Sequence, residues 1–198
     1  MKTTLNKIRK YEPCAAGWQK LLTYLGKAKA DDEPLSIATI LDSNGLDDAL
    51  WCLRAVEGYD REIRLYAVWC ARQVQHLMKD QRSLDALDVA EQYALGKATD
   101  AELAAVRDAA MDAWAAVRDV VRPAGSSGAA ARYAAANAAA NAATTIAAAD
   151  AAAAWAAAWY AARAAAWAVT RSAAGAYATE DAAREKQGAE LRRICGEG

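Results

Sequence analysis

Apolar residues recur every three or four positions through the first 125 residues, which is the spacing of amphipathic helices. The clearest stretch is 61–78, where seven apolar residues form one broad face. They are Ile63, Leu65, Val68, Trp69, Val74, Leu77 and Met78. No segment alternates apolar and polar residues as a strand does. The pattern predicts an all-α fold, a multi-helix bundle with short helices in its N-terminal part.

Proline, glycine and small polar residues divide this part of the chain into short helices. The expected helices cover residues 5–11, 14–25, 31–43, 46–56, 61–78, 83–95 and 100–121. Gly26, Gly45 and Gly58 are the expected stops, and the acidic residues at 31–33 are expected to begin the third helix. The expected caps are Asp60 for the fifth helix, Ser83 for the sixth, and Asp100 or Thr99 for the seventh. Thr99 precedes Glu102 by three residues, the spacing of a capping box.

Alanine dominates the second half, with 31 alanines in residues 129–178. Alanine has the highest intrinsic helix propensity, and its small side chain lets two helices pack closely. One unbroken helix over 129–174 would span about 68 Å, which is long for a compact domain. We therefore expect a break at Thr144-Thr145, with Asp150 capping a second helix, and hence a closely packed alanine-rich hairpin. Thr179 is the expected cap of a last helix over 180–194.

Pro123, Gly125, Ser126, Ser127 and Gly128 form the one break in composition. A flexible linker between two domains is one interpretation. We favour a loop between helices, because the alanine-rich region has too little bulky apolar surface to fold alone. The chain 1–198 is then one domain with sub-regions 1–122, 123–128, 129–178 and 179–198.

Bulky and polar side chains recur every four positions in the alanine-rich region, so that each row forms a ridge on a smooth helix. The two rows are Tyr133, Asn137, Asn141, Thr145 and Trp155, Trp159, Arg163, Trp167, Arg171. The favoured interpretation is structural: alanine faces meet, and the aromatic ridge packs against the first half. The alternative is an exposed partner surface, since Trp and Arg dominate binding hot spots.

The charge balance disfavours direct nucleic-acid binding, because 24 basic residues face 25 acidic ones. The four cysteines form no C-x-x-C pair, and buried free thiols are expected. The basic N-terminus lacks the apolar core of a secretion signal. Residues 151–169 are too alanine-rich to span a membrane around Arg163. A cytoplasmic protein is expected.

Few residues suggest catalysis. His76 is the one histidine, and a partly buried residue near the C-terminus of a helix is the expected setting. No catalytic motif is present, so we expect no enzymatic activity, no cofactor and no metal. One helix carries three arginines, Arg61, Arg64 and Arg72. They either bind a carboxylate or phosphate group, or they form a solvated face with local ion pairs.

Several segments together resemble a known family. They are Lys7-Ile8-Arg9-Lys10, Pro13-Cys14, Gly17-Trp18, residues 44–51 (NGLDDALW), residues 60–65 (DREIRL), Gln75-His76-Leu77 and residues 86–91 (ALDVAE), followed by the Ala/Trp/Arg-rich tail. This combination resembles the Imm-5-like putative immunity proteins, all-α proteins of bacterial and phage genomes, over about residues 5–195. The resemblance implies a protein that binds and neutralises a toxin.

Three functional hypotheses follow. The first is a stoichiometric inhibitor of immunity type whose partner is a toxin or, in a phage, a host defence effector. The second is an enzymatic or small-ligand-binding domain with a pocket near Trp51, Arg54, Arg64, Trp69 and His76. The third is a scaffold that self-associates through its alanine-rich helices. The candidate partner-binding residues are Trp51, Arg54, Arg61, Arg64, Arg72, His76, Trp155, Trp159, Arg163 and Trp167.

Overall fold

The computed structural model describes residues 1–124, 127–144, 151–172 and 177–196, with side-chain surroundings for 1–116, 130–143, 158–169 and 180–196. It confirms the predicted fold class: 77% of the chain is helical, and the ten α-helices assigned pack as a multi-helix bundle. Within the described ranges, every helix is too short or too polar to cross a lipid bilayer.

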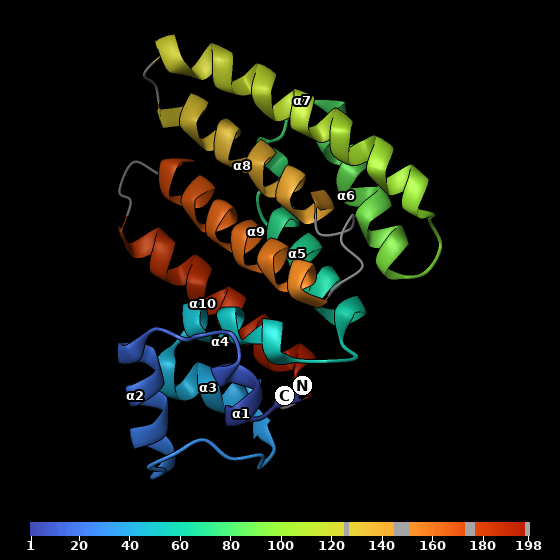
Figure 1. Ribbon diagram of the computed structural model, residues 1–198. Coiled ribbons are helices and arrows are strands. Elements are labelled where there is room, and N and C mark those ends of the chain that lie inside the picture. The colour runs from blue at the N-terminus through green and yellow to red at the C-terminus, as the bar shows by residue number, and fades with distance from the viewer. Residues whose placement is uncertain (125–126, 145–150, 173–176, 197–198) are drawn as a thin grey trace.

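Short helices form one end of the bundle, the lower end in Figure 1. They are α1 (Leu5–Arg9), α2 (Ala15–Leu25), α3 (Ile37–Asn44) and α4 (Leu46–Cys52), followed by the 3-10 turn η1 (Leu53–Ala55). Gly26 ends α2 in the left-handed conformation, with φ of 65°, as the sequence predicted. Gly45 separates α3 from α4 at φ of 94°, which a residue with a Cβ atom would adopt only with strain.

Longer helices form the rest of the bundle. They are α5 (Asp60–Arg72), α6 (Gln81–Ala94), α7 (Asp100–Ala124), α8 (Ser127–Thr144), α9 (Ala151–Ser172) and α10 (Tyr177–Ile194), with the 3-10 turn η2 (Gln75–Leu77) after α5. Helices α7 to α10 lie side by side in chain order, and α5 crosses behind them in Figure 1. Helix α5 packs against α6, α8, α9 and α10, so it is the central element that the alanine-rich helices cover.

The alanine-rich hairpin is present, and α8 and α9 form the most extensive helix–helix contact in the described chain. Each helix turns a wholly buried row of alanines toward the core. The buried alanines include Ala134, Ala135, Ala138, Ala139 and Ala142 on α8 and Ala158, Ala161, Ala162, Ala165 and Ala168 on α9. The helix break falls between Thr144 and Ala151, and the predicted breakpoint residues Thr145 and Asp150 lie outside the described residues.

The capping box at the start of α7 is confirmed. The backbone N–H of Glu102 donates to Thr99 Oγ1 at 3.2 Å, and the Thr99 N–H donates to Glu102 Oε2 at 2.7 Å. These bonds satisfy two backbone donors that a helix start would otherwise leave to solvent. The bonds to Thr99 also lower the pKa of the Glu102 carboxyl group.

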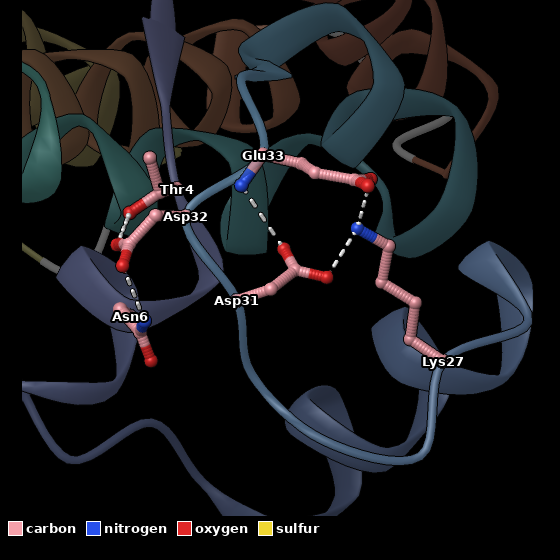
Figure 2. A network of polar contacts seen from close by, with 6 residues as sticks. All are labelled: Thr4, Asn6, Lys27, Asp31, Asp32 and Glu33. Carbon is pink, nitrogen blue, oxygen red and sulfur yellow. Dashed lines mark hydrogen bonds and ion pairs between the residues drawn. The ribbon is translucent and has the colours of Figure 1, made fainter.

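The prediction that the acidic residues 31–33 begin a helix is wrong. Helix α3 begins at Ile37, and the Ser36 hydroxyl caps it by accepting from the Thr39 N–H at 3.0 Å. Figure 2 shows the acids holding the preceding loop instead. Lys27 Nζ lies 2.5 Å from Asp31 Oδ2 and 2.6 Å from Glu33 Oε2, and Asp32 accepts from Asn6 Nδ2 at 2.9 Å. The hydrogen bond from Lys27 lowers the pKa of Asp31.

Three other predicted helix starts differ from the structure. Asp60 is the first residue of α5 rather than its cap, and its charge complements the helix N-terminus from there. Ser83 is buried inside α6, which Asp80 caps by accepting from the Arg82 N–H at 3.0 Å. Thr179 lies inside α10. Helix α6 begins at Gln81 and α10 at Tyr177, so both start before the residue predicted to cap them.

Helix α5 ends at Arg72, six residues before the predicted end. The chain turns at Val74 and forms η2, which lets both Val74 and Met78 reach the core. His76 therefore lies in an exposed 3-10 turn, and the prediction of a partly buried histidine at a helix end is wrong.

Two short strands that the sequence did not predict bring the chain ends together. β1 (Lys2–Thr3) pairs with β2 (Leu35–Ser36) in an antiparallel arrangement too short to produce an alternating pattern. The amino group of Met1 then donates to the Cys195 carbonyl at 3.0 Å. The N- and C-terminal ends accordingly lie next to each other in Figure 1.

All four thiols are free, and three are buried as predicted. Burial raises the pKa of Cys52 to about 12 and also raises that of Cys70. Cys14 departs from the prediction because it caps α2 at the surface, where its sulfur accepts from the Gly17 N–H at 3.4 Å.

We predict that a thiol reagent such as DTNB modifies the native protein at Cys14 alone at pH 8. A raised thiol pKa keeps the protonated, unreactive form at this pH, and burial excludes the reagent from Cys52, Cys70 and Cys195. Absorbance and mass spectrometry should give one modified thiol in buffer and all four in denaturant. Rapid modification of Cys70 in the native protein would contradict the packing of α5.

Candidate functional site

A cavity of about 420 Å³ opens where α4, α8, α9 and α10 meet, and we call it the polar cavity. Its lining is mainly polar and charged: Asp47, Asn137, Asn141, Tyr160, Arg163, Ala164, Trp167, Glu180 and Arg184. Helices α8, α9 and α10 lie side by side in Figure 1, and α4 contacts α9 and α10. Four separate parts of the chain therefore contribute to one concave surface.

The outer face of α9 supplies three of these residues. Tyr160, Arg163 and Trp167 are spaced by three and four positions, so their side chains share one face of the helix. The opposite face carries the buried alanines, and their close packing leaves no space for a large side chain. The large side chains of α9 therefore lie on its outer face. Tyr160 is 51% exposed and Trp167 is 42% exposed, high fractions for aromatic rings.

One carboxylate lies between two arginines in the cavity. Asp47 Oδ1 is 2.7 Å from Arg184 Nη2 and 3.9 Å from Arg163 Nη1. The longer separation is an ion pair without a hydrogen bond. Arg163 also lies with Cζ 4.8 Å from the centre of the Trp159 ring, a cation–π contact. In the described part of the chain, the N–H groups of Arg163 thus have charge partners but no hydrogen-bond acceptor.

Two amides lie one turn apart on α8. Asn141 Nδ2 donates to Asn137 Oδ1 at 3.1 Å, and this is the one side-chain hydrogen bond of either residue within the described ranges. Each amide therefore keeps a donor and an acceptor for another group. Both residues are half-buried on a helix that otherwise consists largely of alanine.

The two tryptophans of the predicted ridge that the structure describes have different surroundings. Trp159 is half-buried against the core and lies edge-on to Tyr160, with ring centres 4.9 Å apart. Trp167 is largely exposed at the polar cavity. The structural interpretation thus fits Trp159 and the surface interpretation fits Trp167. The side chains of Trp155, Thr145 and Arg171 lie outside the described residues.

The other predicted residues lie elsewhere. Arg54 stacks on Trp51, with Cζ 4.0 Å from the ring centre, and Arg64 lies 5.3 Å from the ring centre of Tyr93. Arg72 reaches Asp88 at 2.9 Å and Glu91 at 2.5 Å on α6, so part of the arginine face forms local ion pairs. Arg61 is exposed. His76 lies on η2, and neither it nor Arg64 is among the residues that line the apolar cavity at Trp51 described below.

Trp51 lines a smaller, apolar cavity of about 190 Å³ near the N-terminal end of α2. Trp18, Leu21 and Cys14 lie on the same wall, and an Asn44–Asp48 hydrogen bond of 2.7 Å closes one side. Of the residues predicted to form a pocket with His76, this cavity contains Trp51.

Part of the polar cavity could be predicted from the sequence. Arg163 and Trp167 are candidate partner-binding residues under the alternative interpretation of the ridge, and Asn137 and Asn141 belong to the other row with four-residue spacing. Asp47 lies in the first turn of α4, where an acidic residue complements the helix N-terminus, and it also pairs with Arg184 of α10. No sequence pattern around Tyr160, Glu180 or Arg184 indicates that they line a cavity, because this depends on which helices pack together.

Searches of family models, curated proteins and solved structures find no match for this chain. The described residues hold no cluster of three or more histidine, cysteine or acidic side chains that would bind a metal ion. The resemblance to Imm-5-like immunity proteins therefore stays a prediction, and function must be argued from the surface itself.

Substitution of the α9 ridge should separate its structural residue from its surface residues. We predict that Trp159→Ala lowers the free energy of unfolding by about 1–3 kcal/mol, because a half-buried indole leaves the core. Tyr160→Ala and Trp167→Ala should each stay within about 0.5 kcal/mol of the wild type, because both rings are exposed. Urea denaturation followed by circular dichroism measures all three. A loss at Trp167 as large as at Trp159 would make the ridge wholly structural.

Proposed function

We propose that the protein is a stoichiometric inhibitor of immunity type, which acts by binding a partner protein through the outer face of α9. The partner is a toxin or, if the chain is phage-encoded, a bacterial defence component. The observation that carries this proposal is the exposure of Tyr160 and Trp167 beside Arg163. Tyr, Trp and Arg are the residue types that dominate interface hot spots.

The arrangement of this face supports a binding role. Tyr160 and Trp167 are both exposed, and they share one face of α9 with Arg163. The two residues also line the polar cavity, which offers a partner side chain a concave surface. The resemblance of the N-terminal segments to Imm-5-like proteins points to the same class of function.

The scaffold hypothesis receives less support. It requires the alanine faces of two copies of the chain to pack against each other. In the described parts of α8 and α9, however, these faces are buried within one chain. Another surface would be needed for self-association.

Co-expression with candidate toxins and defence effectors encoded beside the gene tests the proposal. Wild-type protein should restore growth against its cognate partner and elute with it as a 1:1 complex. Tyr160→Ala combined with Trp167→Ala should abolish protection and weaken binding at least about a hundredfold, as expected when two hot-spot residues are removed.

The matched control is Tyr24→Ala combined with Met111→Ala, which removes two exposed apolar side chains from α2 and α7. This control should protect as well as the wild type does. Full protection by the α9 double variant, or no binding of the wild type to any of these proteins, would overturn the proposal.

A further inference from the structure

We propose that the polar cavity is a binding site for a purine nucleotide, specifically an adenine nucleotide. The inference rests on the cavity alone and stands whether or not a partner protein binds the outer face of α9. Its volume of about 420 Å³ lies in the range of pockets that hold small ligands, about 300–1,000 Å³.

The aromatic residues suit the base. Tyr160 and Trp167 stand at the cavity as exposed, rigid rings, and stacking on such rings is a general means by which proteins hold nucleobases. Burying these rings against a flat heterocycle removes apolar surface that the fold leaves in water.

The amide pair suits the edge of the base. Asn137 and Asn141 bond to each other once, so each amide still offers one donor beside one acceptor. An asparagine amide pairs in this bidentate way with the donor and acceptor of adenine N6 and N7. Reversing both amides leaves the same donor and acceptor groups available to the base.

Arg163 suits the phosphate. Its guanidinium contacts the Trp159 ring, and its N–H groups have no hydrogen-bond acceptor in the described part of the chain. Asp47 lies 2.7 Å from Arg184 and farther, 3.9 Å, from Arg163. The carboxylate therefore neutralises the charge of Arg184 more than that of Arg163. An incoming phosphate would take two charge-assisted hydrogen bonds from Arg163.

A purine base with a phosphate group is present both in a free nucleotide and at the end of a nucleic-acid strand. The balanced charge of the chain offers little attraction to the many phosphates of a strand. The site therefore takes a free nucleotide.

Isothermal titration calorimetry of the full chain with AMP tests this assignment. We expect one site per chain and a dissociation constant below about 1 mM. Adenosine without its phosphate should bind at least about tenfold more weakly, as should AMP to Arg163→Ala and to Asn141→Ala, because each change removes hydrogen bonds of the ligand. Arg9→Ala, which removes an exposed arginine from α1, should bind AMP as the wild type does.

Thermal melts of each variant establish that it is folded before titration. If no binding is detected at AMP concentrations well above about 1 mM, the proposal is overturned. Equal affinity of Arg163→Ala and wild type for AMP would also overturn it. Tighter binding of an adenine oligonucleotide than of AMP, with a steep salt dependence, would assign the site to a strand and overturn the choice of a free nucleotide. Loss of AMP binding leaves the growth-protection test of the proposed function unaffected.

Discussion

Alanine-to-alanine contact between α8 and α9 is the constraint on which the rest of the structure depends. The buried faces of both helices consist almost wholly of methyl groups, which bring the two backbones close and leave little space to fill. A methyl group gains little by burial, so the stability of the pair requires many contacts and the cover of α5, with its larger core residues Ile63 and Tyr66. Tyr66 also donates to the Gln187 carbonyl at 3.2 Å, and Gln187 donates to Ala162 at 2.8 Å, which joins α5, α9 and α10.

This constraint also explains where the candidate site lies. Since the inner faces admit only methyl groups, the large residues of α8 and α9 occur on the flanks and the outer face. Asn137 and Asn141 come from one helix, and Tyr160, Arg163 and Trp167 come from the next. Asp47 and Arg184 then close the cavity from α4 and α10 through a long-range ion pair of 2.7 Å. A partner on the outer face and a nucleotide in the cavity would share Arg163 and Trp167, so the two proposals describe adjacent parts of one surface.

The elements that sequence reasoning located correctly are those with local causes. The Thr99–Glu102 capping box and the left-handed Gly26 depend on a few neighbouring residues, and both are where the sequence placed them. The acids at 31–33 show the limit of such reasoning, because Lys27 is held by Asp31 and Glu33 across a loop while Ser36 caps the helix. The polar cavity could be predicted only in part for the same reason. Arg163 and Trp167 follow from the spacing on one helix, but their meeting with Asp47 and Arg184 depends on tertiary packing.

Equilibrium denaturation of Ala138→Leu and Ala161→Leu tests the close contact of α8 and α9 most directly. Both alanines are fully buried, and a leucine at either position should lower the free energy of unfolding by about 1–3 kcal/mol or more, because the added carbons have no space. The same change at the exposed Ala104 of α7 should stay within about 0.5 kcal/mol of the wild type. Unchanged or increased stability of Ala138→Leu and Ala161→Leu would show that the helices are loosely packed and would contradict the account.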